Sequence, residues 1–277
     1  MKKFILSILA LSVLCLTTIA NAKSIRIGTE GAYPPWNNLN SAGELEGAEI
    51  DFGNEACKRM GVDCEWVTQD WDGIIPALLN GKYDIIIAGM SITEERKEKV
   101  NFTNGYMTDG ARFAVLKGNG LDNLSVAGMD KVNLNDAGGK ELAAIGQLIA
   151  AMNGKTICVQ SATIHQNFLE KHMAGAVKVK LYQSVDDTNL DLIAGRCDAI
   201  LADVGSTMDY METDVGANVA FTGPTFSGGV FGDGVGGAIR KEDSDILEMW
   251  NKVIAEMLAD GSLSEITKVH FGRDISM

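Results

Sequence analysis

Proline is scarce in this chain, with 4 residues among 277, whereas glycine is abundant at 31. A low-complexity or collagen-like chain would contain far more proline, so both classes are excluded. No apolar run after the first 22 residues is long enough to span a bilayer, which argues against an integral membrane protein. The remaining composition is typical of a globular α/β protein with one large or two ordinary domains.

Cysteine and histidine do not occur in metal-binding patterns. There is no C-x-x-C pair and no His pair at zinc-ligand spacing, so we expect neither a metal site nor a cofactor. Cys57 and Cys64 are seven residues apart, a spacing that allows a short-loop disulfide in an oxidising compartment. Cys158 and Cys197 fall in separate predicted strands. They could pair, but we favour two buried thiols.

The first residues have the pattern of a secretory signal peptide. A basic start (MKK) precedes a mostly apolar stretch at 4–19, and Ala20, Asn21 and Ala22 form an A-x-A cleavage site. Cleavage after Ala22 would release a soluble protein of about 255 residues into the periplasm. Leu14 before Cys15 is too bulky for a typical lipobox, so we do not predict a lipoprotein.

Positive charge is also in deficit. The chain has 24 Lys and Arg against 37 Asp and Glu, a net charge of −13. Residues 1–22 contain two lysines and no acid, so the mature charge becomes −13 − 2 = −15. This balance argues against nucleic acid or an anionic membrane as partner and does not oppose a cationic ligand.

Strands and helices alternate along the chain, which predicts mostly parallel sheets with right-handed crossovers. We expect strands at 24–29, 64–68, 85–87, 112–117, 155–159, 177–182 and 197–202, and helices at 50–60, 74–79, 141–152, 164–172, 188–194, 243–260 and 263–269. Residues 30–36 should be a loop, 39–46 a turn, and the glycine-rich 227–237 a flexible return. The final helices should pack on the first part of the chain. The segments GKYDII at 81–86 and GRCDAI at 195–200 echo each other, which suggests two similar lobes.

Residues 81–96 (GKYDIIIAGMSITEER) carry the clearest binding signal. The apolar strand ends at Ala88 and Gly89, small residues that let a ligand approach the backbone. Ser91 then offers a hydroxyl, and Thr93 begins a short helix that carries Arg96. An arginine can hold a carboxylate through two parallel hydrogen bonds, so we interpret this segment as an α-carboxylate receptor. The alternative is an ordinary strand-turn-helix joint with a surface arginine.

In open parallel sheets, ligands bind outside the carboxyl ends of the strands. The candidates gathered there are Glu30, Tyr33, Trp71, Ala88, Gly89, Ser91, Arg96, Gln160, Thr163, His165 and Asp203. Asp203 would hold an ammonium group, the two aromatic residues would sandwich a side-chain stem, and Glu30 would pair with a distal cation. The set contains no nucleophile-base pair. A purely structural role is the alternative for each residue, and for His165 a helix-surface position is favoured.

Several segments resemble the family 3 solute-binding proteins of bacterial polar amino acid ABC transporters. They are IGTEGAYPPW at 27–36, EACKRM at 55–60, DWDGIIPALL at 70–79, SITEER at 91–96, AGRCD at 194–198 and FGDG at 231–234. The resemblance spans nearly the whole mature chain and favours the branch that binds lysine, arginine, ornithine, histidine or opines. It implies a two-lobed type II periplasmic binding protein fold, with lobe 1 at 23–109 plus 234–277 and lobe 2 at 110–233.

The resemblance also implies roles for single residues. Arg96 and Ser91 match the carboxylate clamp, Asp203 the ammonium partner, and Cys57 and Cys64 a disulfide of that branch. Glu30 stands where basic amino acid binders commonly have Asp. Ala88 and Gly89 replace hydroxyl residues of some relatives.

The implied activity is binding by a monomer, which closes on a cationic amino acid or opine and delivers it to a membrane permease. Three alternatives stay open. One is a neutral polar amino acid as ligand. Another is a cyclohexadienyl dehydratase-like enzyme that uses Glu30 as general acid, although we expect the acids to be balanced in ion pairs. The third is a receptor's sensor domain, which the absence of a downstream membrane helix disfavours.

Overall fold

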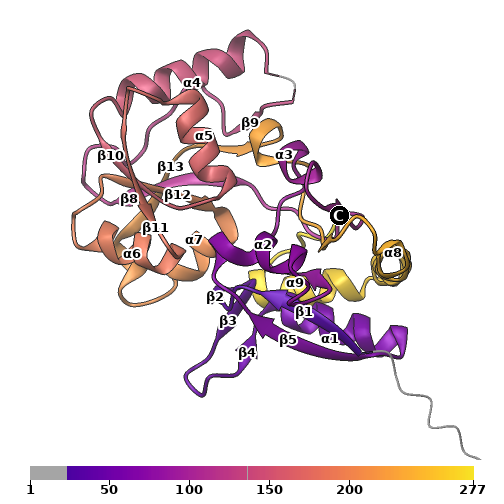
Figure 1. The fold of residues 1–277 in the computed structure, drawn as a ribbon. Coiled ribbons are helices and arrows are strands. Elements are labelled where there is room, and N and C mark those ends of the chain that lie inside the picture. The colour runs from indigo at the N-terminus through magenta and orange to yellow at the C-terminus, as the bar shows by residue number, and fades with distance from the viewer. Residues whose placement is uncertain (1–23, 136) are drawn as a thin grey trace, which may run out of the picture.

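A computed structural model describes residues 24–135 and 137–277, which form two α/β bodies, each around its own sheet (Figure 1). The predicted signal peptide and its cleavage site lie outside the described residues. Within them, no helix combines the length and apolarity needed to cross a membrane.

The first sheet is assembled from both ends of the described chain. Its strands are β1 (Ser24–Thr29), β5 (Asp63–Thr68), β6 (Ile85–Ile86), β7 (Asn101–Phe102) and β14 (Ala238–Ile239). Their order is β5-β1-β6-β14-β7, with β1 parallel to β5 and β6, and β14 antiparallel to its neighbours. The expected strands at 24–29, 64–68 and 85–87 are confirmed to within one residue at their ends.

The first sheet has an apolar cluster on each face. The side chains of β6 and of the residue after it point alternately into the two clusters. Ile85 and Ile87 belong to one cluster and Ile86 to the other, as expected for a strand buried on both sides.

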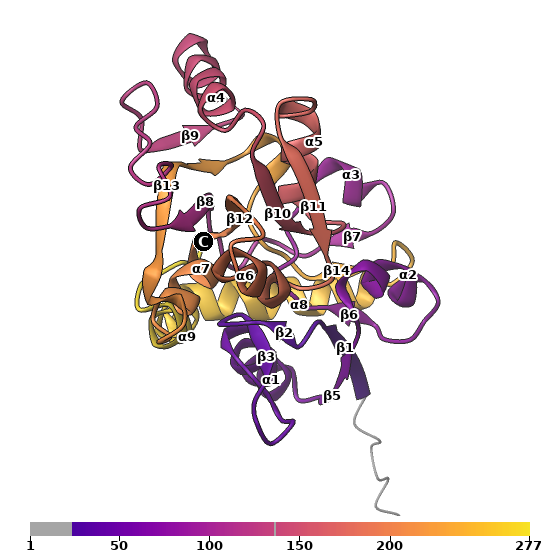
Figure 2. The ribbon, with the colours of Figure 1, turned by 90° about the vertical axis from the view of Figure 1, so that its left-hand side faces the viewer.

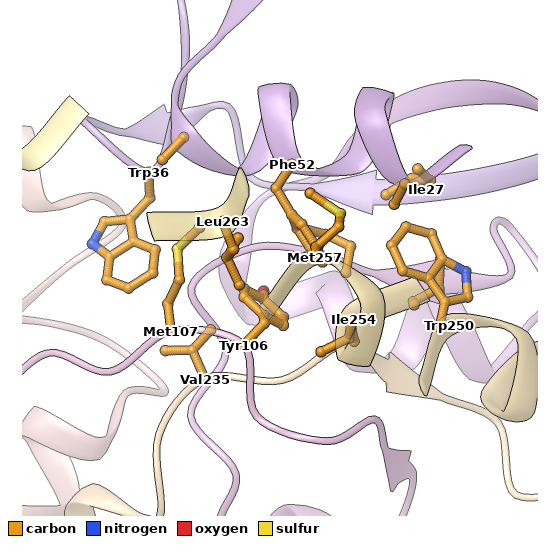
Figure 3. Close-up of a cluster of buried hydrophobic side chains, with 14 of the residues drawn as sticks. Ile27, Trp36, Phe52, Tyr106, Met107, Val235, Trp250, Ile254, Met257 and Leu263 are labelled. Carbon is orange, nitrogen blue, oxygen red and sulfur yellow. The ribbon is translucent and has the colours of Figure 1, made fainter. Parts of the chain in front are cut away.

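The helices of the first body are α1 (Ala48–Met60), α2 (Ile74–Leu79) after the 3-10 helix η1 (Trp71–Gly73), α3 (Glu94–Lys97), α8 (Ser244–Ala259) and α9 (Ser262–Phe271). Phe52 of α1 packs edge-on against Trp250 of α8, with ring centroids 5.9 Å apart (Figure 3). The expected return of the final helices to the first part of the chain is therefore confirmed.

The second sheet is built from a continuous stretch of chain (Figure 2). Its strands are β8 (Ala111–Leu116), β9 (Lys131–Asn133), β10 (Thr156–Gln160), β11 (Lys178–Tyr182), β12 (Ala199–Asp203) and β13 (Val219–Ser227), in the order β11-β10-β12-β8-β13-β9. Its helices are α4 (Gly139–Ala151), α5 (Ile164–His172), α6 (Val185–Ile193) and α7 (Val204–Met211), with 3-10 turns η2 (Gly216–Asn218) and η3 (Gly229–Phe231). Phe113, Phe168 and Phe226 form its aromatic core.

The expected loop at 30–36 is wrong at Ala32–Tyr33, which form a strand, whereas the expected turn at 39–46 is confirmed between two strands, where the Gly43 N–H donates to the Asn40 carbonyl at 2.9 Å. Residues 32–46 form a three-stranded antiparallel sheet of β2 (Ala32–Tyr33), β3 (Asn37–Leu39) and β4 (Leu45–Glu46). Pro34 and Pro35 lie in the connection between β2 and β3, where their missing N–H groups remove no ladder hydrogen bond.

The region 204–237 is more regular than expected. Helix α7 and strand β13 were not predicted, the strand because Gly223 and Pro224 interrupt its apolar pattern. The pairing of β13 with β8 shifts between Thr222 and Phe226, and this irregularity accommodates Gly223 and Pro224. The expected flexible return at 227–237 is ordered in part, since Val235 bridges to Ser91 and Met107.

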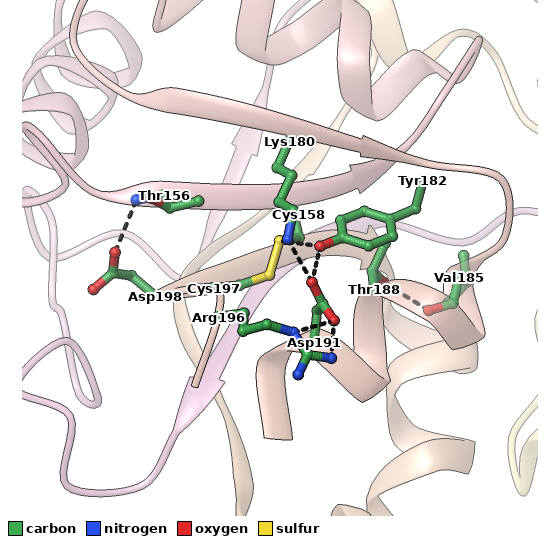
Figure 4. The surroundings of a disulfide bond; sticks show 10 residues. All are labelled: Thr156, Cys158, Lys180, Tyr182, Val185, Thr188, Asp191, Arg196, Cys197 and Asp198. Carbon is green, nitrogen blue, oxygen red and sulfur yellow. Dashed lines mark hydrogen bonds and ion pairs between the residues drawn. A yellow bond between two sulfur atoms is a disulfide. The ribbon is translucent and has the colours of Figure 1, made fainter. Parts of the chain in front are cut away.

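Both cysteine pairs are disulfides. Cys57–Cys64 confirms the short-loop bridge. Cys158–Cys197 also forms a bridge, so our preference for two buried thiols is wrong (Figure 4). Cys158 lies in β10 and Cys197 just before β12, and these strands are neighbours in the sheet, with Cα atoms of the two cysteines 5.9 Å apart. The order of strands, which the pattern of residues did not predict, made the pairing possible.

Candidate functional site

The carboxyl ends of strands from both sheets face each other around one cavity. All of the predicted ligand-binding residues line it, together with Ile164. Glu30 follows β1, residues 88–91 follow β6, Gln160 ends β10 and Asp203 ends β12. Tyr33 comes from β2, Trp71 from η1, Arg96 from α3, and Thr163 and His165 from the start of α5. The structure therefore brings the whole set together.

One end of the cavity carries a guanidinium. Thr93 caps the short helix α3 by accepting a hydrogen bond from the Arg96 backbone N–H at 3.2 Å, which turns this arginine toward the cavity. Its Nη1 donates to the Ser91 carbonyl at 3.0 Å, and its guanidinium carbon lies 5.2 Å from the Trp71 ring centre. Burial lowers the pKa of Arg96 to about 10, so the group keeps its charge at neutral pH. A half-buried cation so placed would be stabilised by an anionic ligand group.

Asp203 supplies a negative charge on the facing strand. Its Oδ2 accepts a hydrogen bond from the Tyr33 hydroxyl at 2.5 Å, and its Oδ1 lies 3.1 Å from His165 Nε2. Burial raises the pKa of Tyr33 well above its usual range, so the phenol remains a hydrogen-bond donor. The helix-surface position favoured for His165 is wrong, since the residue is buried against this carboxylate.

A second carboxyl group, that of Glu30, lies in the same cavity, and no described residue forms an ion pair with it. Its Oε1 accepts a hydrogen bond from Gln160 Nε2 at 2.6 Å, and Gln160 also donates to the Gln183 carbonyl at 2.9 Å. Burial raises the pKa of Glu30 to about 7, and the nearby Asp186 and Asp70 raise it as well. The expected balance of acids in ion pairs is not found here among the described residues. This carboxyl would gain charge and stability from a cationic ligand group.

Two further hydrogen bonds join the two α/β bodies beside the cavity. Trp71 Nε1 donates to the Ala162 carbonyl at 3.1 Å, and Asn167 Nδ2 donates to Glu95 Oε2 at 3.0 Å. Because each bond has one partner in each α/β body, these contacts exist only when the two bodies approach each other.

The sequence analysis missed Glu49, which supports the cavity wall from behind. This fully buried carboxylate in the first turn of α1 accepts the Gly89 N–H at 2.7 and 2.8 Å. It also accepts the Tyr106 hydroxyl at 2.5 Å and Asn37 Nδ2 at 2.8 Å. Burial raises the pKa of Glu49, whereas these donors favour its charged form. The only signal in the sequence was an acid between Ala48 and Ile50, which looks like ordinary helix N-terminal chemistry.

The site offers fixed charges and hydrogen bonds. Within the described ranges there is no cluster of His, Cys, Asp or Glu that could hold a metal ion. The cavity combines one guanidinium with two carboxyl groups and two aromatic rings. This set matches a small zwitterion that carries an additional positive charge.

Comparisons with known proteins agree with this geometry. The chain belongs to the bacterial extracellular solute-binding proteins, family 3, whose model matches residues 25–273. Its fold is that of the two-lobed periplasmic amino-acid-binding proteins.

Among its relatives is the L-arginine-binding protein of Pseudomonas aeruginosa, 38% identical over an alignment 279 residues long that covers 99% of this chain and 98% of that protein. The octopine-binding periplasmic protein of Rhizobium meliloti is 38% identical over 235 residues, 85% of this chain and 79% of that protein. A solved structure of an ancestral arginine-binding protein bound to arginine is 34% identical, with a TM-score of 0.75 over 90% of this chain and 98% of that one.

Proposed function

We propose that the mature protein is the periplasmic substrate-binding component of an ABC importer and that it binds a cationic amino acid. The observation that carries this proposal is the pairing of one guanidinium, Arg96, with two carboxyl groups, Asp203 and Glu30, in one buried cavity. Arg96 and Ser91 would hold the α-carboxylate, Asp203 the α-ammonium, and Glu30 the distal cation. The similarity to binders of arginine and octopine supports the same ligand class.

The proposed binding motion is closure of two lobes, 23–109 plus 234–277 and 110–233. The strands of the first sheet come from 24–102 and 238–239, and those of the second from 111–227, which supports these limits. The chain passes between the sheets near 108–110 and 227–234, where we place the hinge. Closure buries the ligand charges, which need the partners named above. The closed monomer would then deliver its ligand to a membrane permease.

Calorimetric titration of the refolded, ligand-free protein tests the proposal. Arginine, lysine, ornithine, histidine and octopine would be compared with citrulline, which has the length of arginine but an uncharged side chain. We expect at least one cationic ligand to bind at micromolar or lower dissociation constant and citrulline to bind much more weakly. Tighter binding of neutral or acidic amino acids would contradict the role of Glu30 while leaving a transport role intact.

The ammonium partner can be tested with a matched pair of variants on one strand. Asp203→Asn should remove most of the affinity, because a buried ammonium would lose its counter-charge. Asp198→Asn is the control, since that acid lies outside the cavity near the start of the same strand, where it pairs with Lys155. Equal losses in the two variants would contradict a direct contact between Asp203 and the ligand.

One observation favours a second candidate, a dehydratase-like enzyme on the same fold. A buried carboxyl group whose pKa is raised to about 7, such as that of Glu30, has the property of a general acid. Incubation with prephenate or arogenate, followed by detection of phenylpyruvate or phenylalanine, distinguishes the two functions. Turnover that disappears in Glu30→Gln would establish the enzyme, whereas no turnover together with tight amino acid binding supports the transport role.

A further inference from the structure

Helix α7 begins at the ligand cavity, and its N-cap residue does not cap it. Asp203 occupies the N-cap position, but its side chain makes no hydrogen bond to the backbone of the helix. An aspartate at this position normally accepts a hydrogen bond from the N–H of the second or third helical residue. Here its carboxylate oxygens contact Tyr33 and His165 at the cavity instead. Another part of the chain must therefore satisfy the first N–H groups of α7.

Residues 109 and 110, where the chain first passes between the sheets, take over this role. The Gly110 carbonyl accepts the Val204 N–H at 2.8 Å. The Asp109 carboxylate accepts the Gly205 N–H with its Oδ2 at 2.6 Å. These are the N–H groups of the first and second helical residues, where the helix dipole also favours a negative charge. Asp109 thus does for α7 what the side chain of Asp203 would otherwise do.

The carboxylate of Asp109 is held against the helix from two sides. Its Oδ1 accepts hydrogen bonds from the Gly110 N–H at 2.9 Å and from Arg273 Nη2 at 2.8 Å, and the side chain is buried. On the helix side, a methyl group on Gly205 would lie 2.8 Å from Asp109 Oδ2 and 2.7 Å from the ring of Phe271. A larger residue at 205 would therefore push the carboxylate away from the N–H that it accepts.

This arrangement places two carboxylates close together. Burial raises the pKa of Asp109, and the negative charge of Asp203 raises it as well, whereas Arg273 lowers it. A cation beside Asp203 would reduce the repulsion between the two acids. The proposed α-ammonium of the ligand is such a cation, so the capping contact is compatible with a bound amino acid.

We propose that Asp109 is a positioning residue for ligand recognition, because by capping α7 it leaves the carboxylate of Asp203 free to face the cavity and hold the α-ammonium. This inference depends on the proposed function, which assigns the α-ammonium to Asp203. Without an acceptor at 109, the Gly205 N–H would be a buried donor that the N-cap side chain is placed to satisfy. Asp203 would then turn toward the helix and lose its contacts at the cavity. In a purely structural role, Asp109 would only hold Arg273 against the chain crossing, and the direction of Asp203 would not depend on it.

The test uses displacement calorimetry with two matched pairs of ligands. Arginine is compared with 5-guanidinopentanoate, and lysine with 6-aminohexanoate, since the second member of each pair lacks only the α-amine. The quantity measured is the ratio of the analogue's dissociation constant to that of the amino acid, which reports the α-ammonium contact. For the amino acid that the wild type binds more tightly, this ratio should be at least about 10, as expected for a charge-assisted hydrogen bond. A wild type that binds neither amino acid, or that shows a ratio near one, would count against the proposed function.

Variants at 109 and 273 separate the capping contact from the ion pair. Asp109→Ala removes the acceptor, so the ratio should fall toward one. Asp109→Ser should have the same effect, because its hydroxyl lies one bond closer to the backbone than the lost oxygen, and it serves if Asp109→Ala does not fold. Asp109→Asn keeps an acceptor for the Gly205 N–H, and Arg273→Gln keeps the whole carboxylate, although both lose the ion pair. In these two variants the ratio should stay within about threefold of the wild-type value while the urea midpoint falls.

The outcomes that contradict the inference differ from those that contradict the proposed function. A wild-type preference for the amino acid that persists unchanged in Asp109→Ala or Asp109→Ser overturns the positioning role and leaves the proposed function intact. A ratio that falls as far in Arg273→Gln as in Asp109→Ala also overturns it, because the ion pair and not the cap would then control Asp203.

Discussion

Protonation of Glu30 should be coupled to ligand binding. This carboxyl is 9% exposed, and burial raises its pKa to about 7. Near neutral pH much of the free protein therefore holds a proton there. A guanidinium or ammonium beside the group would favour the charged form and return its pKa toward the ordinary 4.5. Binding of a cation should then expel the proton.

The number of protons released follows from the two pKa values of Glu30, about 7 in the free protein and about 4.5 beside a bound cation. At pH 6 about nine-tenths of the Glu30 carboxyls are protonated before binding and almost none afterwards, so about 0.9 proton should be released per ligand. The dissociation constant for arginine should rise about 30-fold as the pH falls from 8 to 5.5. The affinity is highest above pH 7, where the carboxylate is already charged, and it falls as the group becomes protonated.

Calorimetry in buffers of different ionisation enthalpy measures the released protons. Citrulline is the matched control ligand, because it brings the same α-carboxylate and α-ammonium but no distal cation. The surroundings of the α-ammonium, including His165 beside Asp203, are common to both ligands. Glu30→Gln should abolish the difference between them. Equal proton release with arginine and citrulline, or no release at pH 6, would refute the placement of the distal cation at Glu30.

The raised pKa of Glu30 also makes the stability of the ligand-free protein depend on pH. The folded state binds the Glu30 proton more tightly than the unfolded state does, so this group contributes most to stability below pH 4.5. The contribution is lost as the pH rises through about 7, and it amounts to about 3 kcal/mol. Urea unfolding of the wild type and of Glu30→Gln between pH 4.5 and 8 should show this difference, and parallel curves would contradict it.

Three further predictions concern single groups. Arg96→Ala should weaken arginine binding at least 100-fold in calorimetry while affecting agmatine, which lacks the carboxylate, much less; equal losses would exclude a carboxylate clamp. Cys158→Ser should lower the free energy of unfolding by about 2–5 kcal/mol in urea titrations, and a wild-type midpoint that is insensitive to reductant would contradict a structural role for its bond to Cys197. Glu49→Gln should leave at least one hydrogen-bond donor unsatisfied, lower the free energy of unfolding by about 1–3 kcal/mol and weaken ligand binding. Tyr106→Phe should lower the free energy of unfolding by less. Unaltered ligand affinity in Glu49→Gln would show that Glu49 does not support the cavity wall.

The convergence of the site could be predicted because it depends on a rule of sheet topology. Glu30 and Ala88 lie just beyond the carboxyl ends of strands of the first sheet, and Gln160 and Asp203 at those of the second, and within each sheet the carboxyl ends of parallel strands meet at one edge. The rule needs only the positions of the strands, which apolar runs reveal. It does not need their order.

Features that depend on the order of strands or on tertiary partners could not be predicted. The Cys158–Cys197 bond requires β10 and β12 to be neighbours, which no local pattern encodes. Glu49 resembles any acid at a helix start until Gly89 and Tyr106 are placed beside it. The β2-β3-β4 sheet was not predicted, because Pro34 and Pro35 favoured a loop for the whole segment 30–36. The two prolines lie only in the connection between β2 and β3.

The position of β14 in the first sheet has a consequence for the order of assembly. Ala238 pairs with both Ile86 and Phe102, so this strand separates β6 from β7 although it comes after the whole second sheet in the chain. A chain that emerges from its N-terminus therefore presents every strand of the second sheet before the first sheet can be completed. The second body can gain its core while β6 and β7 still lack the strand between them. Arrival of residues 238–239 is then the step that joins the two ends of the chain and fixes the cavity between the sheets.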